Sequence, residues 1–293
     1  VSAFEIANRN FIKKIYFPRG TYWFGTGPTF VDMSLYPNLA DGLEIYGDGD
    51  GKIQFVNWAP IVGTALKIGT TKTLGTMSWL LRGMRFRVCA TEYAFALNGE
   101  EDNPRVEHNN LRLKEFNIFN HLVNNTCNGQ QPPLMPGQTR RSAIGAAYIA
   151  HLYSSYVDTP YCVVQTDAPY AEFNTTAGLT LKEVCYTTLS LRGLGSGGPP
   201  GNFVSPKPWV KENYPGWGVI LRRAVYANTI TQLHCEGSGG CVSIQGPLNV
   251  ENTWTSAVMS MMQRVLISST APDAYNTFES VFVNRYPVKQ ANG

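Results

Sequence analysis

The sequence predicts an all-β protein with the fold of a parallel β-helix. A short apolar–x–apolar unit begins at Val219, Val242 and Val265, so it recurs at a constant step of 23 residues. A strand signal that returns at a fixed step of this size is typical of a solenoid with one coil per repeat. No amphipathic pattern of helical length separates these strands, so strands and turns must close each coil.

The alternation of side chains within these strands predicts which surface is free for binding. Residues of a strand point alternately to its two faces, and neighbouring rungs lie about 4.8 Å apart. The apolar positions of the three units are therefore expected to stack inward, and the residues between them to form outward columns. The expected outward columns are Ile220, Ser243 and Leu266, and Arg222, Gln245 and Ser268. Such a long polar surface suits an extended polymer.

Taken in order, the chain is predicted to form one domain over residues 1–293. Residues 1–60 comprise a short helix at 3–7, two strands within 14–24 around a Pro-x-Gly turn, and a strand pair within 42–55. Residues 61–217 continue the coils with interruptions, and residues 218–293 form the regular coils. The start at Val1 without methionine indicates a processed chain, an expression fragment or, as we expect, part of a longer protein.

Two long turn-rich stretches interrupt the central coils. They cover residues 120–141 and 193–216, and they contain Asn-Asn, Pro-Pro and Gly-Gly-Pro-Pro sequences. Long loops inside a compact domain are usually functional or disordered, and a solenoid extrudes insertions on one side, often the binding side.

Two stretches carry a resemblance to a known family. "IYFPRGTYWF" followed by "GLEIYGDGDGKIQF", and later "NTITQLHCEGSGGCVSI", resemble coils of the pectin-lyase-like right-handed, single-stranded parallel β-helices. Within that superfamily the chain looks most like bacteriophage tailspikes and capsule depolymerases. This resemblance implies a homotrimer on the virion tail that contacts other tail or baseplate proteins and acts on bacterial surface polysaccharide outside the cell. The catalytic signatures of polygalacturonases and pectate lyases are missing, which disfavours plant-type pectin chemistry.

Composition excludes several other classes. The net charge of +3 comes from scattered basic residues, which gives no sign of a nucleic-acid partner. No run of 18 apolar residues indicates membrane insertion, and no signal peptide is apparent. No CxxC pair indicates zinc, and the turn at Asp48–Gly51 lacks the closing Glu of a calcium loop, so we expect neither a metal nor a cofactor. The six cysteines are expected to be reduced core thiols, although Cys235 and Cys241 could bridge the turn between them.

Glycoside hydrolysis requires two carboxylates about 5–10 Å apart, one of them a proton donor. The predicted catalytic residues are Asp167, Glu172 and Glu236, and Asp158 lies in the same polar, aromatic-rich part of the chain as the first two. Sugar rings stack on aromatic faces while their hydroxyls meet polar groups. The predicted substrate-binding residues are Trp209, Tyr214, Trp217, Arg222 and His234, and Tyr153, Tyr156 and Tyr161 are further aromatic candidates. Each has a structural alternative: the aromatics could anchor loops, and Glu236 could cap a turn.

Three interpretations stay open. The preferred one is a virion polysaccharide depolymerase that works by hydrolysis. A polysaccharide lyase is the second, with Arg222, Arg223 and His234 supplying a base and positive charge. The third is a glycan-binding fibre or structural virion protein without catalysis, because the fold alone does not fix function.

Overall fold

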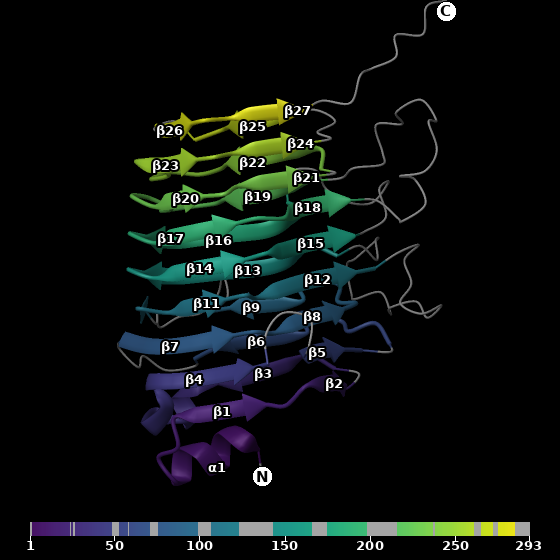
Figure 1. Ribbon diagram of the computed structural model, residues 1–293, viewed down its shortest axis with the longest axis vertical. Helices are drawn as coiled ribbons and strands as arrows, with labels where there is room; N and C mark the ends of the chain where they lie inside the picture. The colour runs from purple at the N-terminus through teal and green to yellow at the C-terminus, as the bar shows by residue number, and fades with distance from the viewer. Residues whose placement is uncertain are drawn as a thin grey trace, which may run out of the picture.

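The protein is a stack of coils in which every strand pairs in parallel with strands of the coils above and below it. The computed structural model describes residues 2–23, 25, 27–48, 53–57, 59–70, 76–98, 107–122, 143–165, 175–197, 216–236, 238–260, 265–271 and 275–284. Figure 1 shows helix α1 beneath the first coil and the last described strand, β27, at the opposite end of the stack. The predicted β-helix is therefore confirmed within this part of the chain.

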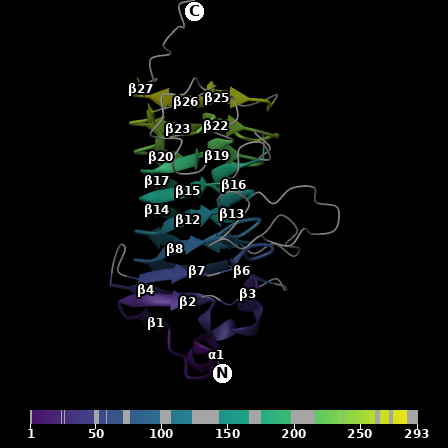
Figure 2. The ribbon, with the colours of Figure 1, turned by 90° about the vertical axis from the view of Figure 1, so that its right-hand side faces the viewer.

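The strands line three walls, which we call faces A, B and C in the order in which the first coil visits them (Figure 2). Face A comprises β1 (Lys14–Phe17), β4 (Asp41–Gly47), β7 (Thr76–Arg82), β11 (Arg112–Lys114), β14 (Tyr156–Thr159), β17 (Thr188–Leu191), β20 (Thr229–Thr231), β23 (Asn252–Thr255) and β26 (Asn276–Glu279). Face B comprises β2 (Gly20–Trp23), β5 (Ile53–Val56), β8 (Arg85–Val88), β12 (Asn117–His121), β15 (Tyr161–Gln165), β18 (Leu194–Gly197), β21 (His234–Glu236), β24 (Val258–Ser260) and β27 (Phe282–Asn284). Face C comprises β3 (Thr29–Asp32), β6 (Leu66–Gly69), β9 (Phe95–Leu97), β10 (Glu107–Asn109), β13 (Gly145–Tyr153), β16 (Ala177–Cys185), β19 (Trp217–Leu221), β22 (Gly240–Ile244) and β25 (Val265–Ser269).

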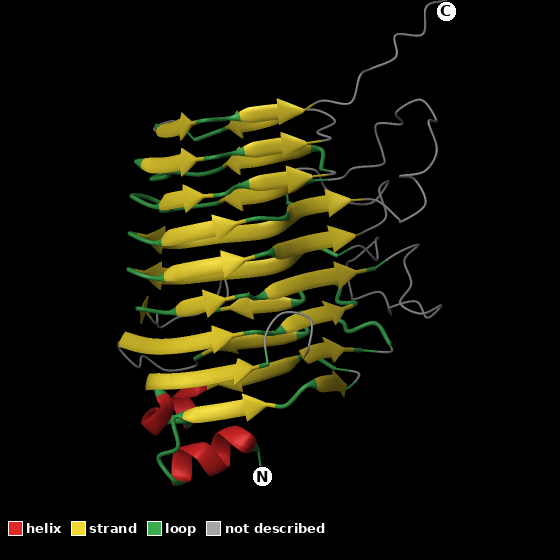
Figure 3. Ribbon diagram, viewed as in Figure 1, coloured by secondary structure: helices red, strands yellow, loops and turns green. Residues whose placement is uncertain are grey.

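The helical elements lie at the N-terminal end of the described chain (Figure 3). They are α1 (Ala3–Arg9) and the 3-10 turns η1 (Met33–Leu35) and η2 (Pro37–Leu39). The Ser2 side chain caps α1 by accepting a hydrogen bond from the backbone N–H of Glu5, and Ala7 faces the core. The predicted short helix and the predicted strands of the first two coils are thus confirmed. The second predicted insertion began too early, because Leu194–Gly197 forms strand β18.

Each wall sends apolar side chains into the core from every coil. On face A, neighbouring coils pair a single inward column. This column consists of Ile15, Ile45, Leu81, Leu113, Val157, Leu189, Ile230, Trp254 and Phe278. The Trp254 and Phe278 rings stack with their centroids 5.3 Å apart. Each coil buries its apolar side only because the next coil covers it, so the stack is stable as a whole.

The predicted constant step of 23 residues is only half right. Val219 pairs with Val242, as predicted, but Val242 pairs with Ile267 rather than Val265. The longer coil gains one residue between faces C and A: Thr229 lies eight residues after Leu221, whereas Thr253 lies nine after Ile244. The other extra residue lies between faces B and C. Corners of different length therefore change the number of residues per coil, while the strands of the three faces stay paired.

A ladder of asparagines, two of them buried and the third half-buried, crosses the corner between faces C and A. Asn228, Asn252 and Asn276 occupy the same position in successive coils, each 24 residues after the last. The Asn252 Oδ1 accepts bonds from the backbone N–H and the Nδ2 of Asn228, at 3.2 and 2.8 Å. The Asn252 Nδ2 donates to the Val225 carbonyl and to the Asn276 Oδ1. The ladder supplies partners for backbone groups that the corner would otherwise bury unpaired.

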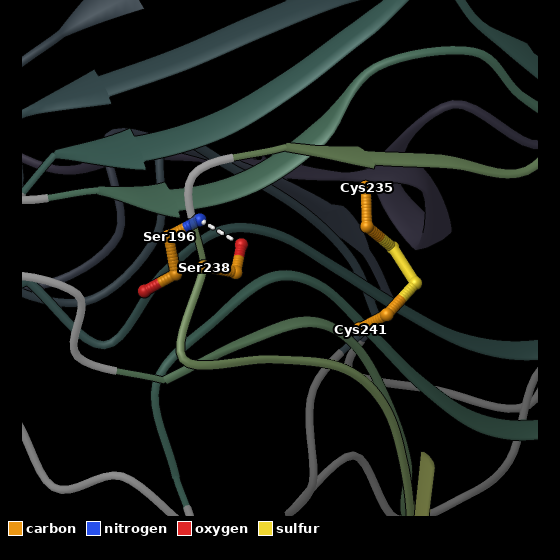
Figure 4. Close-up of a disulfide and its surroundings, with 4 residues drawn as sticks. All are labelled: Ser196, Cys235, Ser238 and Cys241. Carbon is orange, nitrogen blue, oxygen red and sulfur yellow. Dashed lines mark hydrogen bonds between the residues drawn. A yellow bond between two sulfur atoms is a disulfide. The ribbon is translucent and has the colours of Figure 1, made fainter. Parts of the chain in front are cut away.

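The prediction that all cysteines are reduced is wrong. Cys235 of β21 and Cys241 of β22 form a disulfide, shown in Figure 4 beside the bond from the Ser196 N–H to the Ser238 Oγ. Cys89 is also disulfide-bonded. Cys162 and Cys185 are buried thiols outside these disulfides, as predicted. The short segment between Cys235 and Cys241 turns the chain from face B to face C, which brings the two side chains into range.

Candidate functional site

A groove on the outside of face A gathers charged and aromatic side chains from neighbouring coils. Its volume is about 560 Å³. The residues that line it are Arg82, Arg112, Lys114, Glu115, Tyr156 and Asp158. The side chains come from the ends of β7, β11 and β14, where residues alternate between the core and the surface. The groove thus depends on the register in which these three strands pair.

The register stacks the cations of the groove in neighbouring rungs. Arg82 pairs with Lys114, and Arg112 pairs with Leu80 on one side and Tyr156 on the other. Adjacent rungs are about 4.8 Å apart, so these three positive charges lie within reach of a single extended anion. The Arg82 guanidinium also lies 5.8 Å from the centre of the Tyr46 ring. Arginine favours such contacts because its planar group stacks well on aromatic faces.

One of the two carboxylates in the groove is already paired. The Arg192 Nη2 donates to both oxygens of Asp158, at 2.8 and 2.9 Å, and its Nε donates to Oδ1 at 3.2 Å. This two-pronged geometry is the strongest form of carboxylate recognition. Glu115 remains exposed at the corner between faces A and B, where its φ of 52° lies in the left-handed region. With Asp158 neutralised by Arg192, positive charge predominates in the groove.

Four of the predicted site residues lie outside the described residues. They are Asp167, Glu172, Trp209 and Tyr214. Their proposed roles stay predictions. The segments that contain them connect β15 to β16 and β18 to β19, so both lead from face B to face C, as does the segment 123–142. The two predicted insertions therefore follow the same corner of the solenoid, two coils apart.

Glu236 and His234 lie together on the outer side of face B. They are the two outward residues of β21, on either side of the inward Cys235. Tyr161 of β15 lies on the same face; burial and the Glu236 charge raise its pKa, while Arg85 and Arg87 lower it. The structure thus brings two predicted residues close to a tyrosine and two arginines, away from the face A groove.

Trp217 and Arg222 lie on face C and do not join the other predicted residues. Trp217 is packed with Ala177 and Ile220 and only 2% exposed, so it offers no ring face to a sugar in this structure. Arg222 follows β19 and lies close to Tyr93. Burial raises the pKa of Tyr93, and the positive charge of Arg222 offsets part of this increase. The predicted polar surface over β19 is also wrong, because its outward residue Ile220 is buried.

Sequence reasoning missed most of the groove. Tyr156 and Asp158 were noted as candidates, but Arg82, Arg112, Lys114 and Glu115 were not. Their only signal in the sequence is that they lie within or next to short alternating stretches such as 84–88 and 111–113. Without the register, scattered cations cannot be assigned to one surface.

No cluster of three or more His, Cys, Asp or Glu suited to a metal occurs among the described residues. Asp48, in the turn considered for calcium, instead accepts hydrogen bonds from the Tyr16 hydroxyl and the Arg19 N–H. In the same part of the chain, no helix has the length and apolar character needed to cross a membrane.

Comparison with known proteins assigns no family to this chain. No family model matches the chain, and no curated protein matches it. Among solved structures, the chain is similar to the A-module of the mannuronan C-5 epimerase AlgE4 of Azotobacter vinelandii, at 10% identity and a TM-score of 0.32. The likeness covers 97% of this chain and 91% of that one. The parallel strands described above identify the chain as an all-β parallel β-helix protein.

Proposed function

We propose that this protein binds an acidic polysaccharide along the outside of face A. The observation that carries the proposal is the groove with Arg82, Arg112 and Lys114 in adjoining rungs beside the Tyr156 ring. Guanidinium groups bind carboxylates in a two-pronged way, and an aromatic ring accepts the apolar face of a sugar. A polymer of uronic acids presents both kinds of partner at every residue.

Calorimetric titration of the full chain tests this proposal. Polygalacturonate serves as the acidic polymer and dextran as the neutral one. We expect binding of polygalacturonate only, and weaker binding at high salt because salt screens exposed charges. Replacing Arg112 by alanine removes a charge-assisted hydrogen bond of about 1.5–3 kcal/mol, so affinity should fall about tenfold or more.

Arg9 provides the matched control. It lies on α1 and pairs with Glu5 at 2.6 Å, far along the chain from the groove strands. The Arg9→Ala variant loses the same charge and should bind polygalacturonate as the unmodified chain does. Equal losses in Arg9→Ala and Arg112→Ala would reduce the effect to net charge and contradict a specific groove.

Hydrolysis of the bound polymer is the second candidate function, because Glu115 and Asp158 line the same groove. Glu115 would donate the proton, since Asp158 is held by Arg192 as a charged acceptor. New reducing ends that are lost in Glu115→Gln but kept in Glu279→Gln would support hydrolysis. Glu279 is the matched control because it is an exposed carboxylate on face A at the last coil. Ultraviolet absorbance from an unsaturated uronate would instead support a lyase.

The biological setting that we propose is a phage tailspike that meets bacterial capsule or O-antigen as a homotrimer. The resemblance of the coil sequences supports this setting, and a groove that only binds would fit a fibre or adhesin. Light scattering of the purified chain tests the trimer. Polymer binding without any cleavage product from capsules of candidate hosts would favour the adhesin.

A further inference from the structure

Three tyrosines form a ladder on the corner between faces C and A. Tyr153 ends β13, Tyr186 follows β16, and Tyr226 precedes β20, so each comes from a successive coil. The ring centroids of Tyr153 and Tyr186 are 5.2 Å apart, and those of Tyr186 and Tyr226 are 5.6 Å apart. Tyr153 is 40% exposed and Tyr186 is 53% exposed. The rings meet edge to face, at interplanar angles of 70° and 80°, and form an aromatic strip in which Tyr153 and Tyr186 are exposed and Tyr226 is half-buried.

The ladder adjoins the groove described above. Tyr156, which lines the groove, is three residues after Tyr153, and it pairs with Thr188 of the next coil. Thr188 in turn pairs with Thr229. The tyrosines thus run beside an outward column of face A that starts inside the groove and leads toward the C-terminal coils.

The chemistry of face A changes along this column. Within the groove the outward residues are charged except for Tyr156, but from β17 to β23 the outward residues that reach solvent carry hydroxyl groups instead. These residues are Thr188, Thr229, Thr231, Thr253 and Thr255. Uncharged sugars bind by stacking on aromatic faces and by exchanging hydrogen bonds between hydroxyl groups. The surface beyond the groove therefore suits neutral sugars rather than uronates.

One hydroxyl of the ladder, that of Tyr226, is held in its neutral form. The neighbouring Cys185 side chain raises the pKa of Tyr226 to about 12, with smaller contributions from burial and the other two tyrosines. A phenol that stays neutral at physiological pH donates hydrogen bonds to sugar hydroxyls and does not repel an acidic polymer.

We propose that the tyrosine ladder is a stacking platform for the uncharged sugars of an acidic heteropolysaccharide whose uronate residues occupy the groove. This inference rests on the proposed function of the groove and specifies its substrate: a repeat that contains both acidic and neutral sugars. The polymer lies along the axis of the solenoid, with its neutral part toward the C-terminal coils.

The test compares two probes on the full chain. Hyaluronan alternates a uronate with a neutral amino sugar, whereas polygalacturonate contains uronates alone. We expect Tyr186→Ala to weaken hyaluronan binding roughly 2- to 10-fold, the value of one aromatic stacking contact, and to leave polygalacturonate binding unchanged. Tyr186→Phe keeps the ring and should lose less. Tyr275→Ala, which removes a tyrosine that is 61% exposed but outside the ladder, should change neither.

The outcomes separate this inference from the proposed function. If Arg112→Ala leaves polygalacturonate binding intact, or the polymer does not bind, the groove proposal fails. If the Arg112 effect is present but Tyr186→Ala changes neither probe, or weakens both equally, the groove stands and the ladder proposal is overturned. No hyaluronan binding where polygalacturonate binds would also overturn it. Circular dichroism on each variant separates loss of binding from loss of fold.

Discussion

Replacing Asn252 by alanine removes four hydrogen bonds from the middle of the asparagine ladder. The side chain is fully buried, so water cannot take its place. Two partners keep another bond: the Asn228 Nδ2 still donates to the Val184 carbonyl, and the Asn276 Oδ1 still accepts from the Asn252 N–H. The Asn228 N–H and the Val225 carbonyl lose the bonds that they have now.

The expected loss of stability follows from these two backbone groups. Each buried group left without a partner costs about 1–3 kcal/mol, so Asn252→Ala should lower the free energy of unfolding by about 2–6 kcal/mol. The measurement is urea unfolding followed by circular dichroism, with Thr253→Ala as the control. Thr253 is the next residue and points outward on face A, so its change should stay within about 0.5 kcal/mol. A loss in Asn252→Ala no greater than in the control would refute the role of the ladder.

Three further outcomes are expected. The Cys162 thiol, whose pKa is raised by burial, should resist alkylation in the folded protein and react only in denaturant; rapid native labelling would contradict this. Gly218→Ala should destabilise the chain, because its Cβ would lie 2.6 Å from the Cys235 Sγ; an unchanged thermal midpoint would show that the corner relaxes freely. Burial, and to a smaller extent the charge of Arg87, lower the pKa of His121 in the folded protein. As the pH falls below 6.5, the unfolded chain therefore binds a proton at His121 more readily than the folded chain does. Stability should drop in that window, and His121→Gln should flatten the unfolding profile there.

The fold was predictable because it depends on local patterns that repeat. The inward column of face A consists of apolar residues in short alternating strands, and this alternation is visible in any one coil. Asn228 is the first residue of the coil sequence that resembles the known family, but that resemblance did not predict that its side chain is buried or which groups it bonds. What failed was the exact step: Ile267, not Val265, pairs with Val242 because corner lengths vary.

The candidate site was less predictable because it depends on the pairing of distant strands. Arg82 and Lys114 are 32 residues apart and lie in the same column only because β7 and β11 pair in one particular register. A shift of one residue would turn either side chain into the core. The disulfide was considered only as the alternative to free thiols, for another reason. Cys235 and Cys241 are close in sequence, but composition alone favours free thiols in a large core, and only the tight corner geometry reverses that preference.

The unequal corners have a consequence for how such a protein can change. The coil from β22 to β25 accommodates two more residues than the coil before it, yet the strands on all three walls stay paired. The framework therefore tolerates length variation at the corners independently of its interior. Foreign peptides grafted between the exposed residues Pro247 and Leu248, which lie between β22 and β23, should be displayed without loss of the scaffold. Because corner length does not affect strand pairing, residues at the corners can change and alter ligand preference while the stacked core stays the same.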